Sequence, residues 1–237
     1  MTPLFTIILL TLFSGLAIPL GAAIANIKVF NKTWLENEYR HGVIAFGGGA
    51  LLSAVALVLV PEGVERLSVA SSATLFTLGG FFFMSIDIVL SKMKTSASQL
   101  MAMLTDFIPE SLALGATYSI NPQSAYLLAI LIALQNLPEG FNAFDELKKT
   151  STYSNFKIII LFSFLALLGP IAGTSGYIWL VDYPHIIASI MLFSAGGILY
   201  SVFQDIAPQV PLDKHWLPAI GAVFGFMLGL VGYMLTS

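Results

Sequence analysis

Long apolar runs dominate this sequence and set the first constraint on its fold. A helix needs roughly 20 apolar residues to cross the hydrocarbon core of a bilayer. The chain has eight such runs, near 4–27, 42–61, 70–90, 99–120, 124–144, 158–180, 184–206 and 216–236. They are continuous, whereas the strands of a membrane barrel alternate over about ten residues. We therefore predict an all-α integral membrane protein with eight transmembrane helices.

Composition supports this prediction. Only 10% of the residues are charged and 57% are hydrophobic, whereas about 25% of a soluble domain is charged. So few charges cannot cover a water-soluble surface. The absence of cysteine excludes disulfides, thiolate metal sites and thiol catalysis. The loops are short, so we predict a single transmembrane domain over residues 1–237, and the first run is too long for a cleaved signal sequence.

The basic residues predict an orientation for the eight helices. Nine of the ten Lys and Arg residues fall in odd-numbered loops, against Arg66 alone in an even one. Cytoplasmic loops carry an excess of Lys and Arg. We therefore expect cytoplasmic odd loops, both termini extracytoplasmic, and a multi-pass position in the cell membrane. The nine residues are Lys28, Lys32, Arg40, Lys92, Lys94, Lys148, Lys149, Lys157 and Lys214.

Five acidic residues remain inside the predicted spans: Asp87, Asp106, Glu110, Glu139 and Asp205. A charge at bilayer depth costs at least about 2.5–3.5 kcal/mol. Because the spans contain no Lys or Arg, internal salt bridges cannot explain these acids. Either they are protonated or a mobile cation pairs with them, and both interpretations favour cation or proton traffic. The alternative is that each is a protonated hydrogen-bonding group in helix packing, which is strongest for Asp87 and Asp205, near cytoplasmic ends.

The fourth and fifth spans carry a paired motif. Asp106 precedes Glu110 by four positions, as Gln135 precedes Glu139, and each Glu directly follows a proline. Positions i and i+4 share one helix face, so each helix offers two oxygen ligands on one side. A proline inside a helix frees a carbonyl, and broken helices near the midplane hold ions in transporters. Alternatively, each Pro-Glu marks a helix N-terminus, which would split both spans.

These two motifs resemble those of the ZIP (Zrt/Irt-like) divalent-metal transporters, whose consecutive helices carry H-N-x-P-E-G and Q-N-x-P-E-G-type sequences. The resemblance extends to the eight spans, to LVPE at 59–62, and to GGILY at 196–200 leading into DIAP at 205–208. It implies a metal site on the fourth and fifth helices. Carried over by position, the metal ligands would be Asp106, Glu110, Gln135, Asn136 and Glu139.

Three positions depart from the family pattern. Asp106 replaces its His, Phe107 replaces its Asn, and Gly169 stands where the family often has Glu before Pro. The remaining ligand set is all oxygen, which favours hard ions such as Mn²⁺ or Mg²⁺, whereas imidazole suits zinc, copper and iron. The transported ion is thus expected to be of the zinc, iron or manganese class, with cadmium a further candidate. The losses at 107 and 169 favour one metal per chain over two metals bridged by Glu110 and Glu139.

Three further residues are candidates for the transport pathway. Asp205 would lie on the cytoplasmic exit side, and Glu62 would either attract cations at the outer end or be an ordinary solvated acid. Met103, one turn before Asp106, either presents sulfur to the site or packs in the core, the usual role of Met. A ridge of glycines at 221, 225 and 229 would allow close helix packing, within the chain or in a homodimer.

Together these features predict a secondary transporter that carries divalent metal ions into the cytoplasm by alternating access, with metal release coupled to protonation. The chain has no protease or hydrolase motif and no P-loop, so we expect no catalytic residues, no catalytic cofactor and no drive by ATP. The expected partners are the lipid bilayer and the metal ion, without nucleic acid. The alternative is a proton or monovalent-cation carrier on the same scaffold, suggested by Phe107 and Gly169. An intramembrane enzyme using Asp106 and Glu110 lacks any motif.

Overall fold

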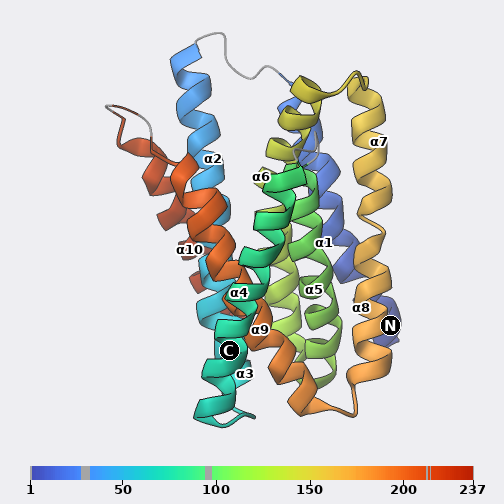
Figure 1. The fold of residues 1–237 in the computed structure, drawn as a ribbon. Helices are drawn as coiled ribbons and strands as arrows, with labels where there is room; N and C mark the ends of the chain where they lie inside the picture. The colour runs from blue at the N-terminus through green and yellow to red at the C-terminus, as the bar shows by residue number, and fades with distance from the viewer. Residues whose placement is uncertain (1, 28–32, 94–97, 212, 214, 237) are drawn as a thin grey trace.

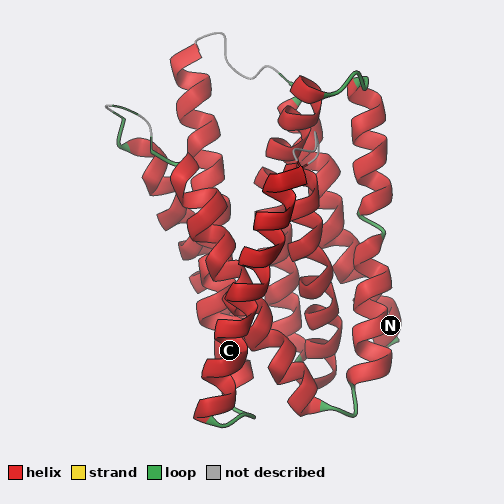
Figure 2. Cartoon of the chain, in the orientation of Figure 1, coloured by secondary structure: helices red, strands yellow, loops and turns green. Residues whose placement is uncertain are grey.

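A computed structural model describes residues 2–27, 33–93, 98–211, 213 and 215–236. Helices joined by short loops make up this part of the chain, which contains no strand (Figure 2). The predicted all-α fold is therefore confirmed. The α-helices are α1 (Pro3–Ala25), α2 (Thr33–Ala54), α3 (Val60–Val64), α4 (Val69–Met93), α5 (Ser98–Ile120), α6 (Pro122–Thr150), α7 (Asn155–Leu165), α8 (Leu168–Leu180), α9 (Pro184–Ser201) and α10 (Leu217–Thr236).

Seven helical segments are long and apolar enough to cross a membrane, so the chain has the character of a multi-pass membrane protein. Among the eight predicted spans, α5 is the one outside this group. It has 23 residues, as many as α1, but it carries Asp106 and Glu110 along its length. It packs against α6, α8 and α9, so neighbouring helices surround the least lipid-like span.

The helices form two sets that meet along the middle of the bundle (Figure 1). In one set α1 packs along α6, and α5 packs along α8 and α6; in the other α2 packs along α10, and α4 along α9. The sets touch where α6 meets α2 and where α5 meets α9. α1 begins and α10 ends toward the same end of the bundle (Figure 1).

The described basic residues are unevenly distributed between the two ends of the bundle. Arg66 follows α3 at the end opposite to the one where α2 and α7 begin. The remaining described Lys and Arg residues lie at or near the latter end: Arg40, Lys92, Lys148, Lys149 and Lys157. The other four residues of the predicted loop bias, Lys28, Lys32, Lys94 and Lys214, lie outside the described residues.

Prolines affect the helices differently from one span to the next. α5 and α6 continue through Pro109 and Pro138, so the alternative in which each Pro-Glu begins a new helix is wrong. The predicted single run at 158–180 is instead divided into α7 and α8. Pro170 has no N–H, and its ring would clash with the carbonyl four residues back. That carbonyl, of Ala166, accepts a hydrogen bond of 3.2 Å from the Gly169 amide at the turn.

Two spans widen into π-helical turns near their ends. One turn, η1 (Val55–Leu59), joins α2 to α3, and the other, η2 (Val202–Ile206), follows α9 and leads into a 3₁₀ turn, η3 (Ala207–Gln209). Each ends two positions before a proline, Pro61 or Pro208. A π-turn relieves the clash of a proline ring with the preceding turn, and such turns often occur at functional sites.

Glycines set the close approaches between helices. The ridge at 221, 225 and 229 on α10 packs directly onto Gly42, Phe46 and Ser53 of α2. The within-chain alternative for this ridge is therefore the one observed. On α2, Gly47 lies against Pro138 of α6, where an added Cβ would be 2.5 Å from the proline ring. The pair at 196–197 on α9 packs instead against α4.

Candidate cation site

The two motif helices meet through a buried hydrogen bond. Gln135 Nε2 on α6 donates to Glu110 Oε2 on α5 over 2.5 Å. Glu110 is 2% exposed and Gln135 is 1% exposed. The opposite oxygen of the amide, Gln135 Oε1, is buried and accepts no hydrogen bond from the described residues. One carboxylate oxygen and one amide group from different helices are thus held face to face.

Asp106 and Glu139, the other two acids of the motifs, line a common cavity of about 40 Å³. Asp106 is 8% exposed, and Glu139 Oε2 is buried without a hydrogen bond from the described part of the chain. Met103 and Asn142 contribute to the same wall, as does Asp205 from η2. Met103 is also part of the main apolar core, so its position combines both roles considered for it.

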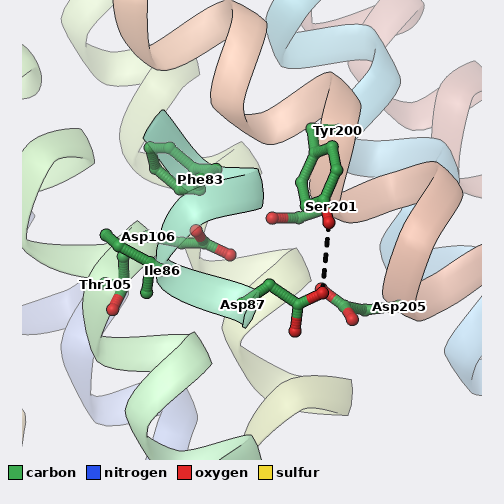
Figure 3. Close-up of a pocket in the computed structure, with 8 residues that line it drawn as sticks. All are labelled: Phe83, Ile86, Asp87, Thr105, Asp106, Tyr200, Ser201 and Asp205. Carbon is green, nitrogen blue, oxygen red and sulfur yellow. Dashed lines mark hydrogen bonds between the residues drawn. The ribbon is translucent and has the colours of Figure 1, made fainter. Parts of the chain in front are cut away.

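A second cavity, of about 20 Å³, is lined by residues of α4, α5, α9 and η2 (Figure 3). Asp106, Ser201 and Asp205 line both cavities. At the far side Tyr200 Oη donates a hydrogen bond of 3.1 Å to Asp87 Oδ2, and Asp87 and Asp205 lie side by side in Figure 3. Acidic side chains from α4, α5, α6 and η2 therefore line neighbouring cavities, from the buried Asp106 to the half-buried Asp205 and Asp87.

These carboxyl groups are close enough to interact electrostatically. Glu139 interacts with Asp106, Glu110 and Asp205, and Asp205 also interacts with Asp87. None of the described Lys and Arg side chains lines either cavity. Like charges repel strongly in a low-dielectric interior. The cluster can therefore be stable only when cations or protons neutralise it.

The carboxyl groups do not form a closed metal cage in this conformation. Within the described residues, no group of three or more His, Asp or Glu side chains is placed to hold one metal ion. The nearest arrangement is the Glu110–Gln135 contact, with Asp106 and Glu139 at the adjoining cavity. Rotating the Gln135 amide by a half turn exchanges its nitrogen and oxygen. Its oxygen would then face Glu110 Oε2, and the two oxygens could bind one cation after moving apart to admit it.

Two predicted site residues have other neighbours. Asn136 Nδ2 donates to Ser14 O of α1 over 2.9 Å, while Asn136 Oδ1 is buried and receives no bond from the described residues. Glu62 lies at the other end of α6, where its Oε1 accepts hydrogen bonds from Asn121 Nδ2 (2.9 Å) and Ser124 Oγ (2.6 Å). Neither residue is brought to the two cavities.

Six polar residues that line the cavities were missing from the predicted site: Asp87, Thr105, Asn142, Tyr200, Ser201 and Gln209. Helical spacing was a usable signal for two of them. Asn142 follows Glu139 by three positions and Ser201 precedes Asp205 by four, so each shares a helix face with an acid already selected. The neighbourhood of Asp87 and Tyr200, 113 positions apart, depends on the packing of α4 on α9 and has no local signal.

A scan against protein-family models and a search of the curated proteins both found no match for this chain. Any function assigned to it therefore rests on the arrangement of its carboxyl groups.

Proposed function

We propose that this chain is a secondary transporter of the ZIP type that carries divalent metal ions across the cell membrane into the cytoplasm through eight spans, with both termini outside. One observation carries the proposal: Asp106, Glu139 and Asp205 line cavities that no described Lys or Arg lines, and the buried Glu110 interacts electrostatically with Asp106 and Glu139. A cation offsets the repulsion between such groups, and a path lined by them favours cations over anions.

Glu110 and Glu139 are the central ligands in this proposal, flanked by Asp106 and Gln135. The contact of Gln135 with Glu110 supports it, because the amide oxygen needs only a rotation to face the ion. Asn136 would join the ligand set through its unbonded oxygen. The all-oxygen set suits a metal of the zinc, iron, manganese or cadmium group with a hard-ligand preference, Mn²⁺ foremost.

The two cavities supply the exit path from this site. Asp205 and Asp87 lie beyond Asp106, toward the end of the bundle at which most of the described basic residues lie. This end is cytoplasmic by the positive-inside rule. Movement of the set holding α5 and α6 against the set holding α2, α4, α9 and α10 would expose the site to each side in turn. Because α2 already covers the glycine ridge of α10, a homodimer would need a different face.

A proton or monovalent-cation carrier is the second candidate. It is favoured by the finding that no three acids of the described chain are placed to hold a metal ion together. Carboxyl groups that lie close together without converging on one point can form a proton relay, in which a proton passes from one group to the next. In neither case do we propose an enzyme, because the sequence carries no protease or hydrolase motif.

Uptake into proteoliposomes separates the two candidates. Vesicles containing the purified chain and a pH indicator are exposed in turn to Mn²⁺, Fe²⁺, Zn²⁺ and Cd²⁺. We expect uptake of at least one of these metals, abolished by Glu139→Gln and retained by Glu65→Gln, which removes an exposed acid after α3. Proton flux that persists after all divalent metals are chelated, without metal uptake, would instead support the proton carrier.

A further inference from the structure

Phe107 lies between Asp106 and Glu110 on α5, and its side chain is fully buried at 0% exposed. The ring reaches across to two other helices. A Cβ atom on Gly169 of α8 would lie 2.7 Å from Phe107 Cζ, and one on Gly15 of α1 would lie 2.9 Å from the same atom. Neither distance is tolerated between real atoms, so the ring fills a notch that exists because both residues are glycine.

This notch adjoins the carboxylate pair. Phe107 and Glu110 are three positions apart and share a face of α5. On α1, Ser14 accepts the hydrogen bond from Asn136, the neighbour of Gln135, while the next residue, Gly15, contacts the ring. The ring thus lies on the α1 and α8 side of the α5–α6 pair. The two cavities, by contrast, reach toward α9 and α4.

Oxygen atoms at the notch already accept hydrogen bonds, Thr11 O from the Ser14 hydroxyl and Ala166 O from the Gly169 amide. The main-chain oxygens of Thr11 and Ala166 lie at the notch, each 2.7 Å from an added Cβ on Gly169 or Gly15 respectively. The Thr11 and Ser14 hydroxyls are already bonded to carbonyls of α1, at 2.8 and 3.1 Å. On the α1 and α8 side of α5, the notch therefore presents an apolar ring, while the Thr11 and Ser14 hydroxyls are occupied by main-chain carbonyls.

We propose that Phe107 is a specificity-determining residue: its ring closes the α1–α8 side of the carboxylate site to water, so the site accepts a divalent ion only after that ion has lost most of its hydration shell. This inference rests on the proposed function. Mg²⁺ dehydrates reluctantly, demands octahedral geometry and usually keeps several waters in protein sites. The ring thus selects against Mg²⁺ and in favour of transition ions such as Mn²⁺, although carboxylate and amide oxygens alone suit both.

Competition between the two ions tests this assignment. Mn²⁺ binding to the purified full chain is followed by electron paramagnetic resonance while Mg²⁺ is added. Phe107→Ala opens the notch, so the Mn²⁺-over-Mg²⁺ preference should fall by about tenfold or more, because Mg²⁺ can keep its waters. Phe107→Leu, which keeps part of the wall, should give a smaller fall. Phe162→Leu alters an equally buried ring on α7, a helix that carries no proposed ligand, and is the matched control for Phe107→Leu.

A second measurement does not depend on any variant folding. The waters on Mn²⁺ bound to the unmodified chain can be counted from hyperfine coupling to ¹⁷O-labelled water, and we expect about one or two. Roughly three or more retained waters would overturn the inference, as would a folded Phe107→Ala protein with unchanged preference. If the unmodified chain binds Mn²⁺ and Mg²⁺ equally, the role of Phe107 is refuted but the proposed function is not. A chain that binds no divalent ion refutes the proposed function and this inference with it.

Discussion

Glu62 and Asp205 occupy similar backbone settings and have opposite surroundings. Each lies within or just after a π-turn near the end of a span, η1 or η2, and close to a proline. Glu62 accepts hydrogen bonds from Asn121 and Ser124. Asp205 lines two cavities and its carboxyl group accepts no hydrogen bond from the described residues.

In our proposal, the difference separates an acid that anchors the fold from one that lies on the ion path. Asn121 caps the N-terminus of α6, where its Oδ1 also accepts the Ser124 amide. Glu62 therefore joins the end of α3 to a helix N-terminus, where a negative charge is favoured. Within the described part of the chain, Asp205 interacts electrostatically with Asp87, Asp106, Glu139 and the Tyr200 phenol. This arrangement weakens the fold unless cations or protons neutralise it. The same local backbone thus supports stability at one end of the bundle and, in our proposal, transport at the other.

The largest expected effect is on transport. Asp205→Asn keeps the size of the side chain but removes its charge from the pathway, so metal uptake into proteoliposomes should fall by about tenfold or more. Thermal stability should stay equal or rise, because repulsion with Asp87 decreases. Glu62→Gln keeps an oxygen that can accept both hydrogen bonds and should retain most of the uptake. Equal losses in the two variants would remove the distinction between them.

The next effect is on stability. Glu62→Ala leaves the Asn121 amide and the Ser124 hydroxyl without their acceptor, which should cost about 1–3 kcal/mol of unfolding free energy. Thermal unfolding in detergent, followed by circular dichroism, measures this change. Glu65→Ala, at an exposed acid three residues away, should stay within about 0.5 kcal/mol of the unmodified chain. If both variants unfold at the same temperature, the bonds of Glu62 do not anchor α3.

Much of this architecture follows from local sequence. Seven of the eight predicted spans appear as long apolar helices, because an apolar run of this length has few alternatives in a bilayer. Spacing also predicts that Asp106 shares a face of α5 with Glu110, and that Gln135 shares a face of α6 with Glu139. The pattern on α5 and α6 is thus readable before any tertiary contact is known.

Contacts between distant segments were not readable in the same way. Glu62 finds its partner 59 positions later, at Asn121, and nothing near Glu62 distinguishes a bonded acid from a solvated one. Phe107 and Gly169 were each interpreted as a lost ligand, yet the two residues touch. The two residues are complementary in shape, because the large Phe107 ring fits only where position 169 has no side chain. This complementarity is visible only in the packed structure.

The smallest expected effect concerns the hydrogen bond between Tyr200 and Asp87, and it tests whether this bond holds α4 to α9. Tyr200→Phe removes the one hydrogen bond found between side chains of the second cavity, from Tyr200 Oη to Asp87 Oδ2. Loss of a single such bond should cost about 0.5–1.5 kcal/mol, less than Glu62→Ala, and should be measured in the same thermal assay. A matched control is Tyr183→Phe, at an exposed tyrosine before α9. A loss for Tyr200→Phe as large as that for Glu62→Ala would mean that Asp87 anchors α4 to α9, and that only Asp205 belongs to the ion path.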